Sequence, residues 1–407
     1  MTAHASSAPQ SPAGLRLGPL FPVLVKAGGI TAGVGLLLAI VAGLMAGDQL
    51  VRFAHSYLLA YTFSLSLLLG AQLFVLIQYL TGAGWATSIR RIPEILSGLL
   101  PVWCLLGLPL LFFLGHLYPW ASPEGPVGAH GPAEGFKAAM MTPFAFGLRL
   151  ILYFAVWSFF GYYYLRKSVE QDKTGSVETT LHLQRLSPVA TIVWALSVSF
   201  FSFDAIMSLD AHWHSTIFGI YFFSGCMVGA LAVIVLLTWF LERSGRIRGA
   251  VNVHHYHDLG KLLFAFNMFW AYIAFSQYML VWYANIPSET SWYAVRLHGS
   301  WQWAGLLLLV GHFLIPFLGL MSRGAKRRPG LLVFWSVWLL VMHLIDTWWL
   351  IVPPLSPGQI SFSFTDLGWT ITFIGLLSAG FGYAARQVPL VAERDPRLPE
   401  ALTHATT

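Results

Sequence analysis

Long apolar segments follow one another along the whole chain, with short polar loops between them. Each is about 20 residues long or longer, the length that an α-helix needs to cross the hydrocarbon core of a bilayer. A membrane-spanning backbone must satisfy its own hydrogen bonds, and the alternation typical of barrel strands is missing. The predicted helices span 22–46, 56–81, 95–118, 143–166, 187–209, 214–241, 257–284, 301–322, 330–352 and 364–386. The pattern therefore predicts an all-α, polytopic membrane protein of about ten transmembrane helices.

The order of these helices favours two bundles inside one membrane domain over 21–386. The second and the sixth predicted helices run in the same direction, so helices two to five and six to nine repeat one succession of directions. We expect one four-helix bundle over about 56–209 and another over about 214–352, with the first and last helices flanking them. Residues 1–20 are predicted as a disordered cytoplasmic tail, and 387–407 as a cytoplasmic C-terminal tail.

Composition excludes a water-soluble fold. Charged residues make up 10% of the chain and hydrophobic residues 57%, whereas soluble domains carry about 25% charged residues. The two cysteines, Cys104 and Cys226, lie inside apolar segments, and no haem-attachment or iron–sulfur spacing is present. We therefore expect no cofactor and no metal to be bound by this chain.

The net charge of +6 is distributed unevenly between the two sides of the predicted membrane domain. Of 23 lysines and arginines, 17 fall in the two tails and in alternate loops, and three fall in the other loops. The positive-inside rule then places both termini in the cytoplasm and the chain in the inner membrane. Basic residues in such short loops favour anionic membrane lipid as their partner, and they argue against nucleic acid.

The densest group of ionisable residues lies where the fifth predicted helix meets the sixth at the outer side. Asp204 lies about 9 Å deeper than Asp210 along the helix axis. His212 and His214 follow Asp210 and titrate near neutral pH, so this group can pass protons to the outer water. The alternative is structural: Asp210 caps the sixth helix and the histidines lie among lipid headgroups.

A second group begins the seventh predicted helix on the cytoplasmic side. Asp258 and Lys261 are three residues apart, so they share a helix face and can pair. The same stripe continues through Tyr272, Ser276 and Tyr283, which predicts a polar face along the whole helix. The alternative is that Asp258 caps the helix and Lys261 extends to the surface. The neighbouring histidines lack carboxylates or cysteines in a ligand pattern, so a metal site is not expected.

The remaining ionisable residues inside predicted helices are His312, His343, Asp346 and Arg149. Buried charges are costly in a membrane and are functional candidates by default. A histidine beside a carboxylate, as at His343 and Asp346, suits proton relay. The two histidines can also be read as haem ligands or as hydrogen-bonded structural residues. Arg149 requires a carboxylate partner, for which Asp204 and Asp346 are the candidates.

Several strings in this chain resemble a bacterial respiratory family, the ActF-type membrane subunit of alternative complex III, a quinol:electron-acceptor oxidoreductase. The resemblance covers roughly residues 20–385. The strings are FDAIMSLDAHW at 203–213, STIFGIY at 215–221, YHDLGKLLFAF at 256–266, FSQYM at 275–279 and WYANIP at 282–287.

The resemblance implies an NrfD-like or polysulfide-reductase-like membrane subunit with ten helices in two four-helix bundles. It implies as partners a paralogous membrane subunit that holds the main quinol site, together with periplasmic haem and iron–sulfur subunits. The resemblance thus places quinone and quinol in the complex, and it leaves open whether they bind to this chain. The family's proton-conducting role would fall on Asp204, Asp210, His214, Asp258 and Lys261. The roles of Tyr272, His312, His343 and Asp346 rest on the residue pattern alone.

Two other classes of protein remain open. A secondary transporter can also have ten helices and buried charges, and breaks at matching places in its two halves would support it. The eighth predicted helix has a break at Pro316, and no counterpart is evident in the first half. A structural anchor for periplasmic redox subunits is the second alternative. An anchor needs no buried charge, so Asp204 and Arg149 argue against a purely structural role.

Overall fold

A computed structural model describes residues 15–45, 49–122, 140–210 and 212–405. Within these ranges the secondary structure is helical and contains no β-strand. Ten of the helices are long and apolar enough to cross a membrane, which confirms the predicted fold class. Most of the predicted N-terminal tail and the middle of the longest outer loop, 123–139, lie outside the described residues.

The spanning segments follow the predicted order. They are α1 (Leu20–Met45), α2 (Gln49–Leu80), α3 (Arg91–Ser97) with α4 (Leu100–Gly107), α7 (Pro143–Thr174), α8 (Val177–Ala205), α9 (Phe218–Arg243), α10 (Val253–Ala284), α12 (Trp301–Leu307) continuing through η6 (Leu308–Leu314) into α13 (Ile315–Met321), α15 (Pro329–Ile351) and α16 (Phe364–Ala384). Shorter elements are η2 (Gly84–Ser88), η3 (Leu108–Leu111), α5 (Leu114–Leu117), η4 (Pro119–Ala121), η5 (Met207–Leu209), α11 (Pro287–Leu297), α14 (Arg323–Arg327), η7 (Pro353–Leu355) and α17 (Leu398–Leu402).

Two predicted helices differ from the structure in instructive ways. The third, expected as one helix over 95–118, is broken into α3, α4, η3 and α5. Pro101 and Pro109 interrupt it because proline has no backbone N–H to continue the helical hydrogen bonds. The fourth extends beyond its predicted end at 166 to Thr174, where Gly175 adopts a left-handed conformation (φ 66°) and ends it.

The spanning helices pack in two groups joined along α2 and α9. In the first group α2 contacts α3, α4 and α8, and α7 contacts α4 and α8; in the second, α9 contacts α10 and α15, and η6 and α13 contact both α10 and α15. Helix α2 is the most enclosed span, since 94% of its apolar window is buried. Its position explains why it carries serine, threonine and glutamine side chains inside the membrane domain.

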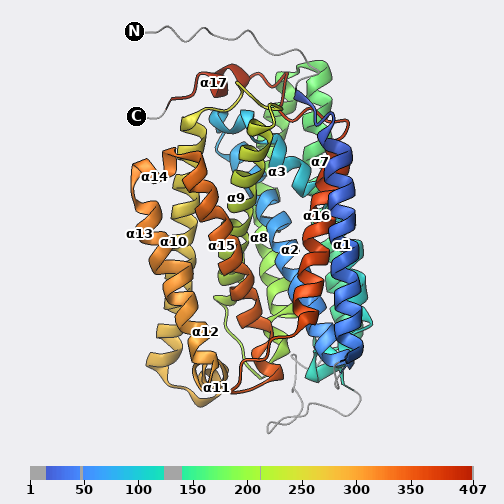
Figure 1. The fold of residues 1–407 in the computed structure, drawn as a ribbon, viewed down its shortest axis with the longest axis vertical. Helices are drawn as coiled ribbons and strands as arrows, with labels where there is room; N and C mark the ends of the chain where they lie inside the picture. The colour runs from blue at the N-terminus through green and yellow to red at the C-terminus, as the bar shows by residue number, and fades with distance from the viewer. Residues whose placement is uncertain (1–14, 46–48, 123–139, 211, 406–407) are drawn as a thin grey trace.

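Helices α1 and α16 form a closely packed pair at one side of the molecule (Figure 1). Small residues on both helices allow this approach. A Cβ atom added to Gly35 would lie 2.5 Å from the backbone nitrogen of Thr372, and one added to Gly28 would lie 2.6 Å from that of Ala379. A larger residue at either glycine would force the two helices apart.

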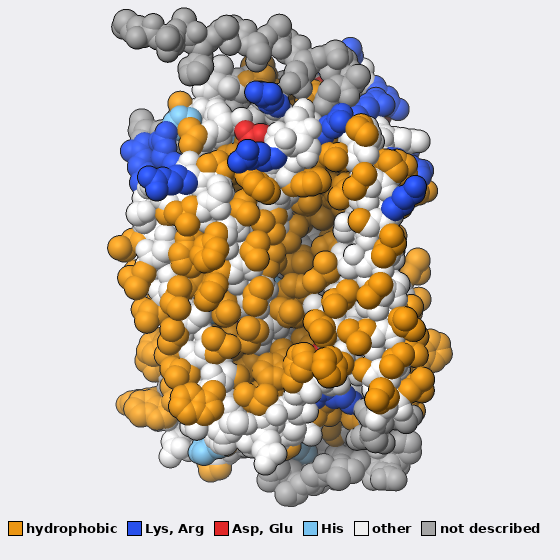
Figure 2. Space-filling model, viewed as in Figure 1, with side chains coloured by type: hydrophobic (Ala, Val, Ile, Leu, Met, Phe, Trp, Pro, Cys, Tyr) orange, Lys and Arg blue, Asp and Glu red, His pale blue; other side chains and the backbone are white. Residues whose placement is uncertain are grey.

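Lysine and arginine side chains gather at one end of the molecule, which we call the basic end (Figure 2). The start of α1, α14 and α17 lie at this end, and α11 and α12 lie at the opposite end (Figure 1). Between the two ends, the face shown in Figure 2 is a broad band of apolar side chains. An apolar band flanked by polar ends matches the surface of a protein that spans a bilayer.

Candidate functional site

A buried carboxylate, Asp346, lies inside the second group of helices at 2% exposure. One of its oxygens accepts a hydrogen bond from the hydroxyl of Tyr221 on α9. The other accepts from the indole nitrogen of Trp270 on α10 at 3.2 Å. Three different helices thus converge on one ionisable group, which is the arrangement expected for an intramembrane functional residue. We call Asp346, Tyr221, Trp270, His312 and His343 the central cluster.

His343 lies one helical turn from Asp346 on α15 and connects the cluster to the first group of helices. Its Nε2 atom is 2.8 Å from the hydroxyl of Ser66 on α2. Helix α9 makes room for the imidazole with two glycines: a Cβ atom at Gly225 or at Gly229 would lie 2.9 Å from a carbon of this ring. The predicted proximity of His343 and Asp346 is therefore present, and glycines of α9 enclose the histidine.

His312 lies in η6, a π-helical segment, and is fully buried. Pro316, four residues later, has no N–H to bond to the carbonyl of His312, and π segments commonly arise where the regular ladder is interrupted. The imidazole stacks on Trp270, with ring centroids 3.8 Å apart. Neither ring nitrogen has a hydrogen-bond partner among the described residues. His312 thus stacks on the ring of the tryptophan whose indole nitrogen donates to Asp346.

The buried face of α10 differs from the predicted stripe. Asn267, Trp270 and Gln277 face the interior, whereas Tyr272 is 65% exposed and Tyr283 is 84% exposed. The polar stripe predicted through Tyr272 and Tyr283 therefore lies on the exposed side of α10, away from the central cluster. The side chain of Asn267 and the amide oxygen of Gln277 lack partners among the described residues. Asn267, Trp270 and Gln277 are separated by three and seven residues, which places them on one face of a helix. This spacing was the signal in the sequence for the polar inner face.

Asp258 binds two basic groups at the basic end. One oxygen lies 2.5 Å from the ammonium nitrogen of Lys261, as the spacing predicted, and the other lies 2.5 Å from Nε2 of His404. The helix is capped by Asn252, whose side chain accepts from the backbone nitrogens of His254 and His255. The alternative that Asp258 caps α10 was therefore wrong, and its two oxygens are engaged by Lys261 and His404 instead.

The C-terminal segment, expected as a tail over 387–407, packs onto the basic end as far as the described residues extend. Leu390 and Val391 are buried, and Asp395 is 3% exposed. Asp395 pairs with Arg90 at 2.7 Å, and His404 contacts Asp258 as described above. No local pattern predicted this packing, because the partners of Asp395 and His404 lie far away along the chain.

A second buried charge cluster stabilises the basic end of the first group of helices. Arg90 pairs with Glu94 at 2.8 Å, and Arg91 pairs with Glu94 at 3.1 Å and with Asp172 of α7 at 2.8 Å. The side chains of Arg91 and Glu94 are fully buried. Arg90 and Arg91 belong to the basic residues counted in the loops between predicted helices. Their partners come from α7 and the C-terminal segment, so the sequence alone did not reveal the cluster.

Arg149 on α7 and Asp204 on α8 form a bidentate ion pair in the first group of helices. Two guanidinium nitrogens lie 2.8 Å from the two carboxylate oxygens, and the hydroxyl of Tyr153 donates to the same carboxylate at 2.7 Å. Of the two partners considered for Arg149, Asp204 is the correct one and Asp346 is not. About a fifth of each paired side chain is exposed.

The turn before α9 is organised by Asp210, whose carboxylate accepts from the backbone nitrogens of His212 and Trp213, both at 3.2 Å. Helix α9 begins later, at Phe218, so Asp210 closes the turn and does not cap the helix. His214 is exposed. The alternative that Asp210 caps this helix was therefore wrong, and the carboxylate closes the preceding turn instead.

Arg296 falls between the predicted helices 257–284 and 301–322. In the structure it lies in α11 and is buried at the same end of the molecule as Asp210. Its guanidinium lies 3.5 Å from the ring centroid of Trp292 and donates to the carbonyl oxygens of Trp349 and Leu350. Burial lowers the pKa of Arg296, and the negative charge of Asp210 opposes that shift. An arginine retains its proton at neutral pH, so this end of the second group carries a fixed positive charge.

Among the described residues, no cluster of three or more histidine, cysteine or acidic side chains has the geometry of a metal site. The polar groups are instead distributed along the second group of helices, from Asp258 at the basic end to the central cluster. Such a distribution can hold and transfer protons. Comparison of the sequence with known protein families and with characterised proteins finds no match.

Proposed function

We propose that the chain is an integral-membrane subunit of a respiratory quinol oxidoreductase of the alternative complex III type. In this proposal it lies in the inner membrane with both termini in the cytoplasm, and it conducts protons that accompany quinol-linked electron transfer. The observation that carries the proposal is Asp346, a carboxylate buried between three helices and hydrogen-bonded by Tyr221 and Trp270.

A buried ionisable group inside a membrane domain costs several kcal/mol and is retained where it has a function. Asp346 has no arginine or lysine within ion-pair distance among the described residues, unlike Asp204 and Asp366, which pair with Arg149 and Arg52. An unpaired buried carboxylate can change its protonation without breaking an ion pair. This property suits a proton carrier better than a structural anchor.

The proposed route runs through the second group of helices. Asp258 and Trp270 are about 18 Å apart along α10. A single hydrogen bond cannot bridge this distance. Asn267 lies between them, and its side chain has no partner among the described residues. Buried polar groups in this position are normally satisfied by internal water. Because Asn267 itself lies about 13.5 Å from Asp258 along the helix axis, the proposed route requires a chain of several waters from Asp258 past Asn267 to the central cluster.

The proton-transfer roles predicted for Asp204, Asp210 and His214 remain predictions. Asp204 is held in the first group of helices by Arg149 and Tyr153. The proposal therefore places the principal route at Asp346, with Lys261 and Asp258 at its cytoplasmic mouth. Electrons would move through partner subunits: a paralogous membrane subunit that binds quinol, and periplasmic subunits that carry haem and iron–sulfur clusters.

The described helices offer little support for a secondary transporter. Such a protein would have broken helices in matching places of its two halves. Here one break separates α3 from α4, in the second span of the first group. The other is at η6, in the third span of the second group. The breaks thus fall at different positions in the two groups.

Purification of the chain with its native neighbours tests the proposal. A tag on the C-terminus would disturb the packed segment around His404, so the tag belongs on the N-terminus. We expect a second polytopic subunit together with haem and iron–sulfur subunits, and quinol oxidation by the preparation. A chain that purifies alone from mild detergent, and that exchanges a solute across proteoliposomes, would contradict the proposal and favour a transporter.

A further inference from the structure

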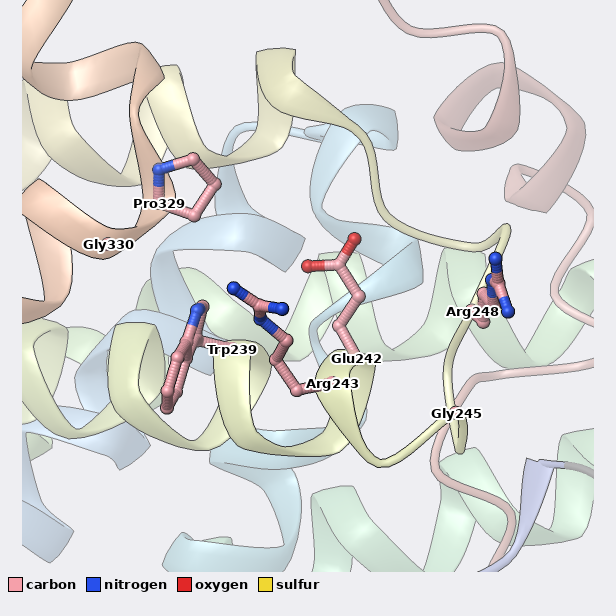
Figure 3. A pocket seen from close by; sticks show the side chains of 7 residues that line it. All are labelled: Trp239, Glu242, Arg243, Gly245, Arg248, Pro329 and Gly330. Carbon is pink, nitrogen blue, oxygen red and sulfur yellow. The ribbon is translucent and has the colours of Figure 1, made fainter. Parts of the chain in front are cut away.

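A surface cavity of about 470 Å³ opens at the basic end between the end of α9 and the start of α15 (Figure 3). It is lined by Trp239, Glu242, Arg243, Arg248, Pro329 and Gly330, among others. These residues come from three places in the chain: the last turn of α9, the loop that follows it, and the first turn of α15. The cavity lies away from the central cluster and has no part in the proposed proton route.

The charge of the cavity is set by two arginines. Arg243 and Arg248 are exposed, and neither lies within ion-pair distance of a carboxylate among the described residues. The one acid in the lining, Glu242, accepts a hydrogen bond from the hydroxyl of Tyr256 at 2.5 Å. The guanidinium of Arg243 lies over the ring of Trp239, with 5.7 Å to the centroid. Two guanidinium groups are therefore available to a ligand that enters the cavity.

The position of the cavity favours an amphipathic ligand. It lies between the last turn of α9 and the first turn of α15, at the basic end, and the apolar band of the surface begins next to that end (Figure 2). Along α15, starting one residue beyond Gly330, a stripe of apolar side chains is exposed on the outside of the molecule: Leu331, Phe334, Val337 and Val341. A ligand with an anionic head in the cavity and hydrocarbon chains along α15 would contact both features.

We propose that this cavity binds the phosphate-bearing headgroup of an anionic phospholipid. Guanidinium groups bind phosphate through paired, charge-assisted hydrogen bonds. Basic pockets between transmembrane helices on the cytoplasmic side are suited to such headgroups. Trp239 supplies an amphipathic ring at headgroup depth. The acyl chains of the lipid would lie against the exposed stripe of α15.

Lipid binding to the purified chain, or to its complex, tests the proposal by native mass spectrometry in a neutral detergent. The probes are phosphatidylglycerol, phosphatidylcholine and inorganic phosphate. The variants are Arg243→Gln, Arg248→Gln and the double variant. The matched control is Arg185→Gln, which removes another exposed arginine, on α8 outside the cavity.

We expect phosphatidylglycerol to bind with preference over phosphatidylcholine. Each basic residue near an anionic lipid contributes about 1 kcal/mol, so each single variant should lose about fivefold in affinity and the double variant roughly thirtyfold. Arg185→Gln should retain the parental affinity. Folding is monitored separately by thiol accessibility, since both cysteines are buried.

Two results would overturn the proposal. Equal losses of phosphatidylglycerol affinity in Arg185→Gln and in the double variant would show that the lipid is attracted by the positive charge of the molecule as a whole and not by the cavity. Displacement of phosphatidylglycerol by an equal concentration of inorganic phosphate would show a site for free anions, because a lipid held also through its chains should resist such displacement. The outcome is independent of the proposed respiratory function.

Discussion

Replacing Arg91 with methionine tests whether the buried charge cluster stabilises the basic end. Methionine keeps the apolar length of the side chain and removes the guanidinium. The change deletes the contacts to Glu94 at 3.1 Å and Asp172 at 2.8 Å, and it leaves Asp172 without its ion-pair partner. Because the Arg91 side chain is fully buried, solvent offers no compensation for the carboxylate that remains.

Removing one partner of a buried ion pair costs about 3–5 kcal/mol. We expect a loss of this size in the free energy of unfolding for Arg91→Met. The double variant Arg91→Met/Asp172→Asn should recover part of it, because it also removes the unpaired charge. The control Lys167→Met removes a cation from the exposed Lys167–Glu170 pair, with side chains 35% and 51% exposed, and should cost less than about 1 kcal/mol.

The assay follows the reaction of Cys104 and Cys226 with a thiol-reactive dye in detergent, since both thiols become accessible on unfolding. Where labelling reports the unfolding equilibrium, a loss of 3–5 kcal/mol raises the labelling rate by roughly two to four orders of magnitude. A labelling rate for Arg91→Met no higher than that for Lys167→Met would refute the role assigned to the cluster.

Three further predictions follow from the structure and the sequence. Arg149→Met should destabilise the chain more than Arg149→Met/Asp204→Asn in the same thiol assay, because the single change leaves a carboxylate unpaired; equal stability would contradict the pairing. A reporter fused after Arg248 should report the cytoplasm and one fused near Ser356 the outside, and a reversed result at either position would invalidate the proposed topology. The isolated chain should show no haem band in a reduced-minus-oxidised spectrum, and a stoichiometric band would disprove this expectation.

The spanning helices were predictable because apolar length is a local property of the sequence. The break in the third helix was readable from Pro101 and Pro109, although the predicted boundaries missed it. The orientation of α10 was harder to predict. Tyr272 and Ser276 marked a plausible polar face, but tyrosine is amphipathic and tolerates the outer surface of a membrane protein. The packing of α10 against α9, α15 and η6 places Asn267 and Trp270 in the interior instead.

Features that depend on distant parts of the chain were not predictable from one sequence. The contact between Asp258 and His404 joins residues 146 positions apart, and Asp395 reaches Arg90 across 305 positions. The hydrogen bond from Tyr221 to Asp346 likewise joins two helices whose pairing no local pattern shows. The sequence identified Asp346, His312 and His343 as candidates, and tertiary packing supplied their partners.

The most direct test of the proposed proton route compares two buried aspartates in the assembled complex reconstituted into vesicles. Asp346→Asn removes the unpaired carboxylate of the central cluster. Asp366→Asn removes a carboxylate of similar burial. Asp366 lies in the first turn of α16 and pairs with Arg52 of α2. The measurement is proton movement per quinol oxidised, normalised to the amount of assembled complex. We expect Asp346→Asn to lower this ratio while Asp366→Asn leaves it at the parental value; an unchanged ratio in Asp346→Asn would contradict the route.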